Sequence, residues 1–346
     1  MEVYYIGLLL LIILWMILGK NRSTRYKNGW WCLSAWFILS IIEGLRSFDI
    51  GTDTSMYTYL FSIDGMDSFE PGFQLLGILV HLITDDPTYF LLFIALITNG
   101  LIVYSVYKIS SQPFISIFSY ITLYYYFQSF NAMRQYIAIG VILVAYSFLR
   151  KNKILIYLIA TLIAIFFHNS AIVGLLLLPY HFFKISKKKP ASLLKSLIVP
   201  FVLGAMVAIF FKIGLNLFIA IFPKYYVYLQ MTEFAGISVV QQIVVNSTIF
   251  LAYLLFTDNK EYILPLGTAV ALSFMISSVG LLIRFIWFFD IFSIFAIAEI
   301  WNTNLIETRS KIILRILILT SSLSFMTYYL AMNVMRVANY SSSILD

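Results

Sequence analysis

The chain has 346 residues, of which 61% are hydrophobic and 11% are charged. A soluble globular protein carries about 25% charged residues, so water cannot be the main solvent of this chain. The formal net charge of +7 comes from short basic clusters between apolar runs, which is typical of membrane topology and not of a nucleic-acid-binding face. The sequence therefore predicts an all-α, polytopic integral membrane protein.

The chain offers little for redox or metal chemistry. Cys32 is the only cysteine, which excludes an internal disulfide and a cysteine metal cluster. Three scattered histidines do not form a metal site, so no cofactor is expected. The apolar start, residues 4–18, has no basic region before it and no cleavage site after it, and we interpret it as a retained helix. A single membrane domain is expected over residues 1–346.

Lysine and arginine gather in three clusters between the apolar runs, and such clusters mark the cytoplasmic side of a membrane protein. The clusters lie at residues 20–27, 150–153 and 184–189. Spans at residues 4–18 and 30–45 flank the first cluster. With the chain starting outside, a polar loop, residues 46–70, follows on the outer side.

The apolar segment that follows this loop, residues 71–84, is too short for a spanning helix, which needs about 20 residues. If it crossed the membrane, the cluster at residues 150–153 would fall outside, against the positive-inside rule. We therefore expect a re-entrant or interfacial segment. The next helix is expected to begin with Asp86 as its cap and Pro87 in its first position.

Residues 154–183 have basic flanks at both ends, so they must go up and return. The polar tip of this hairpin is His168, Asn169 and Ser170. The limbs are short, so we expect the hairpin to hold His168 below the outer surface, in a cavity. The other spans are expected at residues 88–107, 114–128, 132–149, 193–211, 239–256, 262–281, 285–301 and 312–330. The total is about 12 transmembrane helices plus the re-entrant segment, with both termini outside.

Arginine is concentrated at the outer ends of the expected spans, whereas the inner side uses more lysine. The outer arginines are Arg46, Arg134, Arg284 and Arg336. A guanidinium group suits phosphate or carboxylate, and it is costly near hydrocarbon without a partner. For one arginine alone, a structural ion pair or a headgroup contact is an equal alternative. The set predicts an anionic ligand.

Carboxylates and one histidine complete the candidate residues. Asp49 and Asp53 flank a glycine turn in the outer loop, where they either bind a sugar hydroxyl or form a solvated, self-paired loop. Glu70 either starts the re-entrant helix or faces the same cavity. His168 is either a buried hydrogen-bonding residue or a base. Asp290 lies within an apolar span, where a carboxylate is a functional candidate, with a structural ion pair as the alternative.

Five motifs follow one another in a fixed order along the chain. They are Arg46 with Gly51, Asp53 and Tyr57; Glu70-Pro71-Gly72; Asn131 with Arg134-Gln135; His168 with Ser170-Ala171; and Arg284 in a late span. In order and spacing they resemble the EpsG/Wzy family of bacterial membrane polysaccharide polymerases. The resemblance implies a glycosyltransferase that joins oligosaccharide repeat units carried on undecaprenyl pyrophosphate, on the outer face of the cytoplasmic membrane. Its product would be O-antigen, capsular polysaccharide or exopolysaccharide.

The residues and the resemblance together give a hypothesis for the site. The expected catalytic residues are His168, Asp53 and Arg134, with the arginines neutralising the pyrophosphate leaving group and either His168 or Asp53 as the base. The expected substrate-binding residues are Arg46, Asp49, Glu70, Asn131, Gln135, Arg284 and Asp290. The expected partners are the lipid-linked oligosaccharide and the lipid bilayer, with a chain-length regulator protein left open and nucleic acid excluded.

Two other functions are compatible with a membrane chain of this kind. A flippase for the lipid-linked oligosaccharide would also need outward arginines, but its helices should form two related halves, and the sequence has no internal repeat. A membrane acyltransferase would use a histidine with a cytoplasmic acyl donor, whereas His168 is expected on the outer side.

Overall fold

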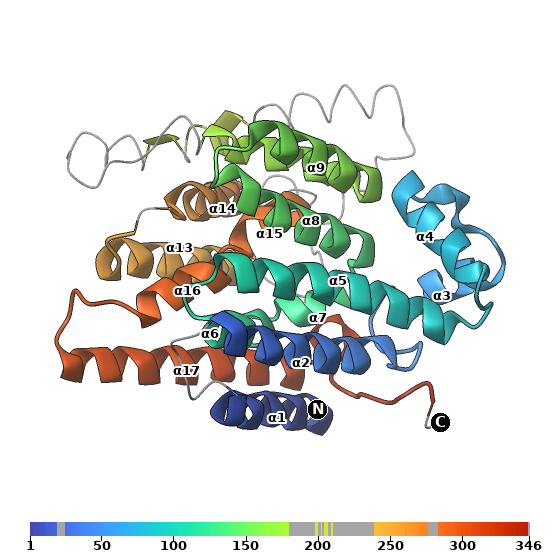
Figure 1. Cartoon of the computed structure of the whole chain (residues 1–346), viewed down its shortest axis with the longest axis horizontal. Helices are drawn as coiled ribbons and strands as arrows, with labels where there is room; N and C mark the ends of the chain where they lie inside the picture. The colour runs from blue at the N-terminus through green and yellow to red at the C-terminus, as the bar shows by residue number, and fades with distance from the viewer. Residues whose placement is uncertain are drawn as a thin grey trace. The chain divides into compact units, whose positions relative to one another are not determined.

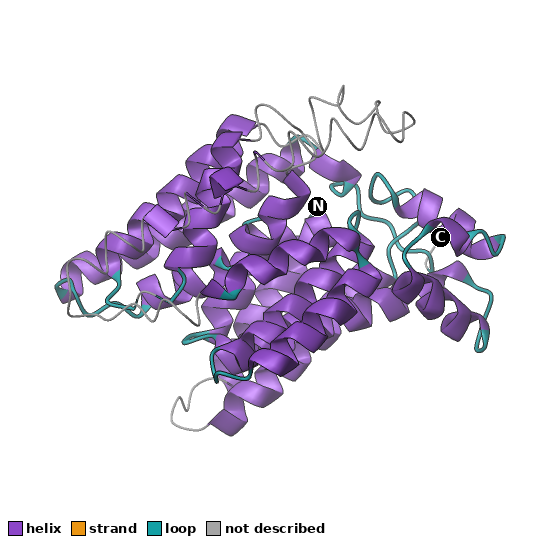
Figure 2. Cartoon of the chain, turned by 90° about the horizontal axis from the view of Figure 1, so that it is seen from above, coloured by secondary structure: helices purple, strands orange, loops and turns teal. Residues whose placement is uncertain are grey.

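The computed structural model describes residues 1–18, 25–179, 239–259, 261–275 and 283–344, with single positions between 198 and 209. Every regular element in these ranges is a helix (Figure 2), apart from an isolated antiparallel bridge between Arg46 and Ser342. The all-α prediction is confirmed for this part of the chain. The expected span at 193–211 and the basic residues 184–189 lie largely or wholly outside the described residues.

The chain forms two compact units. The first comprises residues 1–172 and 317–346, and the second comprises residues 173–316. Two packing units are compatible with one membrane domain or with two. The expectation of a single domain therefore stays a prediction.

Helix α5 (Pro87–Ile109) is the centre of the first unit, where it packs against α2 (Arg25–Gly44) and α8 (Met133–Leu149) (Figure 1). Its start is as predicted, because the Asp86 side chain accepts a hydrogen bond of 2.8 Å from the backbone amide of Thr88. Helix α1 (Glu2–Leu18) packs against α2.

Helices α8 and α9 (Ile154–Phe167) are packed neighbours joined by a short basic turn, residues 150–153. Arg150 Nη1 donates a hydrogen bond to the carbonyl oxygen of Ile109 (3.4 Å), the last residue of α5. The basic ends of α5 and α8 and the start of α9 therefore lie together. The other end of α8, with the end of α9, carries the candidate site. After α9 the second limb of the expected hairpin is a 3₁₀ helix, η2 (Asn169–Leu177).

The predicted outer loop is partly helical, which corrects the expectation of a loop throughout residues 46–70. It contains α3 (Thr54–Ser62) and the 3₁₀ helix η1 (Met66–Ser68). Polar residues at both ends of the segment indicate a loop, but α3 within it has an apolar face that is buried at Tyr57 and Phe61.

Helix α4 (Pro71–His81) occupies the segment predicted not to span, and its 11 residues are too few to cross a bilayer. One face is buried through Phe73 and Val80, while Leu75 and Ile78 are exposed on the other. A short helix with an apolar outer face agrees with a re-entrant or interfacial position.

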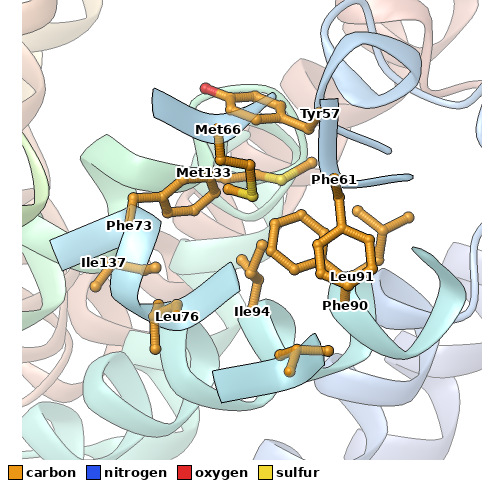
Figure 3. Packing of buried hydrophobic residues seen from close by; sticks show 11 residues of the cluster. Tyr57, Phe61, Met66, Phe73, Leu76, Phe90, Leu91, Ile94, Met133 and Ile137 are labelled. Atoms are coloured by element: carbon orange, nitrogen blue, oxygen red, sulfur yellow. The ribbon is translucent and has the colours of Figure 1, made fainter. Parts of the chain in front are cut away.

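An aromatic and aliphatic cluster fixes α3 and α4 against α5 and α8 (Figure 3). The ring of Phe61 stacks on Phe90, with centroids 4.4 Å apart. The ring of Tyr57 meets that of Phe73 edge to face, with centroids 5.6 Å apart. Met133, at the start of α8, belongs to the same cluster. Burial of these side chains holds the polar residues next to them, including Glu70 and Arg134, in place.

The expected span at residues 114–128 is broken into α6 (Pro113–Thr122) and α7 (Tyr125–Ser129). Tyr124 lies between them with a left-handed backbone (φ 75°), which an aromatic residue rarely adopts. Its buried hydroxyl donates a hydrogen bond of 2.8 Å to the carbonyl oxygen of Val334. This tertiary contact accompanies the break, and hydropathy alone gives no sign of it.

The second unit contains α13 (Val239–Phe256), α14 (Ile263–Met275), α15 (Ile283–Asp290) and α16 (Ser293–Trp301). The last two correct the expected span at residues 285–301, which is interrupted after Asp290. At the interruption, Phe292 donates its amide hydrogen bond to Phe289 and Ile294 donates to Ile291, in place of continuous α-helical bonding.

Two described helices, α5 and α17 (Thr308–Ala331), are long and apolar enough to cross a bilayer by themselves. Several other apolar helices have 10–17 residues. Long and short helices alike carry exposed aliphatic side chains on their outward faces, such as Leu155 and Leu162 on α9 and Ile313 on α17. These faces suit a lipid environment, while the total of about 12 spans stays a proposal.

The segment after α17 returns to the start of the outer loop. Ser47 donates its amide hydrogen bond to Ser341 (2.9 Å), and Ser343 donates to Leu45 (3.0 Å). Gly51, six residues into that loop, donates to the carbonyl oxygen of Arg336 (2.9 Å). The last described residues are therefore an integral part of the first unit.

Candidate functional site

Charged side chains from distant parts of the sequence meet at one end of the first unit. Glu70 precedes α4, Arg134 lies in the first turn of α8, and His168 follows α9. Glu70 Oε1 lies 2.9 Å from His168 Nδ1, and Glu70 Oε2 accepts a hydrogen bond from Arg134 Nη1. The amide of Asn169 also donates to Glu70 Oε1 (3.4 Å). The structure thus brings together three residues that the sequence had singled out.

Helix packing explains why these residues meet. Helices α8 and α9 are antiparallel, so the start of α8 and the end of α9 share one end of the pair. Helix α4 packs against α9, and Gly72 allows the close approach. A Cβ atom at Gly72 would lie 2.8 Å from the carbonyl oxygen of Phe166, closer than real contacts allow. The glycine of the Glu-Pro-Gly motif therefore lets Glu70 reach His168.

Two aromatic rings border Arg134. Its Nε donates a hydrogen bond of 3.1 Å to the Tyr57 hydroxyl. Its guanidinium carbon lies 4.5 Å from the ring centroid of Phe69, a cation–π distance. Tyr57 belongs to one of the five sequence motifs but had no predicted role, and Phe69 was not predicted as a site residue. The available signal was the position of Phe69 directly before Glu70.

The cluster is mostly buried but not closed. The exposed side-chain fractions are 19% for Arg134, 9% for Glu70 and 10% for His168. Burial alone would raise the pKa of Glu70, but the hydrogen bond with His168 and the positive charge of Arg134 outweigh it and lower this pKa to about 2. Glu70 is therefore a carboxylate at neutral pH.

Arg46, expected to bind substrate, is occupied within the protein. Its side chain is buried and donates hydrogen bonds to the carbonyl oxygens of Phe130 (3.0 Å), Ile50 (3.4 Å) and Glu43. The guanidinium group also lies 4.8 Å from the ring centroid of Phe130. The carbonyl of Glu43 belongs to the last turn of α2, where helix carbonyls lack partners and attract a cation. Arg46 thus joins α2, the outer loop and the residues before α8.

Asn131 is likewise directed at the outer loop. Its Oδ1 accepts hydrogen bonds from the Thr52 amide, the Thr52 hydroxyl (3.0 Å) and the Asp53 amide (3.3 Å). Gly51 forms the turn with φ +102°, which favours glycine. The carboxylate of Asp53 is exposed, one helical turn before the Tyr57 that contacts the cluster, and Asp49 is exposed as well. Neither aspartate contacts Glu70.

The remaining predicted residues lie elsewhere. Gln135 is buried in α8. Arg284 and Asp290 lie in the second unit, in α15, where Asp290 is buried and accepts a hydrogen bond of 2.8 Å from Gln242 Nε2. Sequence reasoning did not find Gln242. A contribution of Arg284 and Asp290 to the Glu70 cluster stays a prediction.

The cluster has the chemistry for an anionic substrate with a reacting hydroxyl. A guanidinium group binds phosphate oxygens, and an imidazole accepts a proton. In the described part of the chain, no group of three or more histidine, cysteine, aspartate or glutamate side chains is placed to hold a metal ion.

The comparison with known families gave a match that covers most of the chain. The sequence model of the EpsG family matches residues 29–342, a range that includes every residue of the cluster. Neither the comparison with curated proteins nor that with solved structures gave a match. The EpsG family is membrane-associated and is linked to exopolysaccharide biosynthesis. Because the family match extends over far more than half of the sequence, the chain belongs to the EpsG family.

Proposed function

We propose that the chain is a polysaccharide polymerase that joins undecaprenyl-pyrophosphate-linked repeat units into O-antigen, capsular polysaccharide or exopolysaccharide. The observation that carries the proposal is the arrangement of Arg134 and His168 on the two oxygens of Glu70. A cation for a pyrophosphate and an imidazole for a hydroxyl proton lie side by side. Family membership supports a substrate from polysaccharide synthesis.

The same proposal places the site on the outer face of the cytoplasmic membrane. The cluster lies at the end of α8 and α9 opposite the basic turn at residues 150–153. The 17 residues of α8 extend about 25 Å, close to the hydrocarbon thickness of about 30 Å. With the basic turn in the cytoplasm, the cluster faces outward. A multi-pass chain of about 12 spans, with α4 as its re-entrant segment, completes this topology.

The reaction we propose is a glycosyl transfer between two lipid-linked substrates. The bond from the sugar carbon of the growing chain to the pyrophosphate oxygen breaks, and a bond forms from that carbon to a hydroxyl oxygen of the incoming unit. The hydroxyl proton passes to His168, and the pyrophosphate leaves as an anion that Arg134 neutralises. Asp53 is the second candidate base, but its carboxylate lies outside the cluster.

The other predicted residues divide into two groups under this proposal. Arg46 and Asn131, whose partners lie within the outer loop and its surroundings, hold the loop in place. We still propose substrate contacts for four residues predicted from the sequence, namely Asp49, Gln135, Arg284 and Asp290.

Polymerisation of a purified lipid-pyrophosphate-linked repeat unit by the chain in proteoliposomes tests the proposal. We expect a ladder of products with the wild type and none with Arg134→Ala. Arg309→Ala, which removes an exposed arginine at the start of α17, is the matched control and should leave the ladder intact. A folded wild type that makes no ladder from authentic substrate would overturn the proposal.

Cells that lack the protein separate a polymerase from a flippase. Loss of a polymerase leaves single repeat units displayed at the surface, because each unit still crosses the membrane. Loss of a flippase removes them. Surface labelling of single units in the deletion strain is therefore expected, and their absence would favour the flippase.

A further inference from the structure

We infer that Glu70 is a positioning residue that acts through His168, holding the imidazole in the tautomer with its proton on Nδ1 and its lone pair on Nε2. The inference rests on the proposed function, in which His168 takes the hydroxyl proton. It replaces the expectation that Glu70 binds substrate. Both carboxylate oxygens are already engaged, by His168 Nδ1 and by Arg134 Nη1.

The tautomer follows from the chemistry of the contact. An ionised carboxylate has only acceptor sites, so the nitrogen that lies 2.9 Å from Glu70 Oε1 must carry the proton. In the neutral ring, Nε2 is then the nitrogen that can take a proton from a hydroxyl. A third donor, the amide of Asn169, also points to Oε1 and fixes that oxygen further.

The backbone around His168 supports a fixed ring position. His168 ends α9 with an extended conformation (φ −159°, ψ 121°), so its side chain leaves the helix direction at this residue. Its own amide is held by the carbonyl oxygen of Ala164 (3.0 Å). The direction of the imidazole is therefore set from two sides, by the end of α9 and by Glu70.

Arg134 balances the charge of Glu70, so the carboxylate does not require a charged imidazole as its partner. A base needs the neutral imidazole, whose proton lies on Nδ1 when Glu70 accepts it. Glu70, before α4, contacts His168 directly, and Arg134 on α8 contacts the other oxygen of Glu70. Tyr57 of α3 contacts that arginine in turn. Glu70 therefore has a fixed cation on one oxygen and orients the imidazole with the other.

Glutamine at position 70 is a sharp probe of this role. It has nearly the shape of glutamate, but it offers one acceptor oxygen and one donor NH₂ group. Arg134 Nη1 can only donate, so the glutamine oxygen should accept from it and the NH₂ group should face His168 Nδ1, which accepts only if the ring proton moves to Nε2. Asp67→Asn is the matched control, because it removes an exposed carboxylate in η1.

A double-mutant cycle on the reconstituted chain separates positioning from direct substrate binding. We expect Glu70→Gln to lower the polymerisation rate about 10- to 100-fold, a range typical of residues that orient a reacting group. In the His168→Ala background the same change should lower the residual rate by less than about 3-fold, since two residues that act as one unit are not additive. If Glu70→Gln lowers the polymerisation rate by the same factor with and without His168, the inference is wrong, while the proposed polymerase function stands. If the reconstituted wild type makes no product, the proposed function itself is wrong.

Nitrogen NMR of the full chain labelled with ¹⁵N-histidine gives a readout that does not depend on activity. The chain has three histidines, so the His168 signals are assigned by their loss in His168→Gln. We expect a neutral ring with its proton on Nδ1 in the wild type and in Asp67→Asn. In Glu70→Gln we expect a shift towards the Nε2-protonated form. An Nε2-protonated wild type, or a spectrum that Glu70→Gln leaves unchanged, would overturn the inference.

Discussion

Arg134 and Arg46 lie in the same unit, and both were expected to bind an anionic substrate, but their surroundings differ. Arg46 is 1% exposed and donates mainly to backbone carbonyl oxygens. The Arg134 side chain is 19% exposed and meets a carboxylate, a phenol and an aromatic ring. Backbone carbonyls cannot move away without rearranging the main chain that carries them. A carboxylate and a phenol on side chains can yield to a phosphate.

This contrast gives a rule for arginines near hydrocarbon. The residue type alone signals that a partner exists, because an unpaired guanidinium group there is costly. The kind of partner then separates structure from function. Backbone partners indicate a structural role, and side-chain partners with partial exposure indicate a place where a ligand can enter.

The largest expected effect is on activity at the partly exposed arginine, Arg134. Arg134→Gln should lower the polymerisation rate about 10²- to 10³-fold, the range for loss of one group that stabilises a developing anion. Its thermal unfolding midpoint should fall less than that of an Arg46 variant, because Glu70 keeps His168 and the amide of Asn169 as partners. Rates and unfolding curves measured on the same preparation test the contrast. A strongly lowered midpoint would make Arg134 as structural as Arg46.

The buried arginine should show the opposite pattern. Arg46→Met should lower the free energy of unfolding by about 3–5 kcal/mol, because it leaves the carbonyl oxygens of Phe130, Ile50 and Glu43 without their donor, and an unsatisfied buried acceptor costs about 1–3 kcal/mol. Unfolding in detergent, followed by circular dichroism, measures this loss. If the variant folds as stably as the wild type but fails to polymerise, Arg46 belongs with the substrate.

A smaller effect is expected at Asn131, which holds the outer loop. Asn131→Ala should destabilise the protein by about 1–3 kcal/mol, because it leaves the amides of Thr52 and Asp53 without their acceptor. Asn131→Asp keeps an oxygen in that position and should recover most of the loss. Unfolding curves of the two variants give the comparison, and equal losses would show that the acceptor oxygen is not what matters.

The smallest effect concerns acid stability. The pKa of Glu70 is about 2 in the folded chain, below its ordinary value of 4.5, so the folded state binds fewer protons between these values. The stability that Glu70 contributes is therefore complete above about pH 4.5 and is lost as the pH falls towards 2. Between pH 7 and pH 3 the melting temperature of the wild type should fall by about 2–4 °C more than that of Glu70→Gln. Parallel pH profiles for the two proteins would refute the ion pair.

Much of the first unit was predictable from the sequence, because local signals agree with the packing. Asp86 and Pro87 begin α5 as predicted, and the short apolar segment after Glu70 is a short helix. His168 ends a limb at the expected tip. Capping residues and the length of an apolar run depend on few neighbours, so a single sequence carries them.

Other features depend on contacts that no local pattern reports. The left-handed Tyr124 is tied to Val334, and the break after Asp290 lies beside a contact with Gln242. The sequence also grouped Arg46 with Arg134, because it identifies the residue type but not its acceptors. Where a guanidinium group points is a tertiary property.

The hydrogen bonds between the last described residues and the outer loop bear on how the protein is made. Residues 45–51 emerge from the ribosome early, but Ser341 and Ser343, which complete their bonding, are translated near the end of the described chain. Domains fold largely as they are synthesised, yet this loop cannot reach its final form until the segment that follows α17 has been translated. We expect ribosome-bound chains stopped before residue 333 to be inserted in the membrane with the loop still accessible to protease, and the loop to become protected only after the segment that follows α17 has been translated.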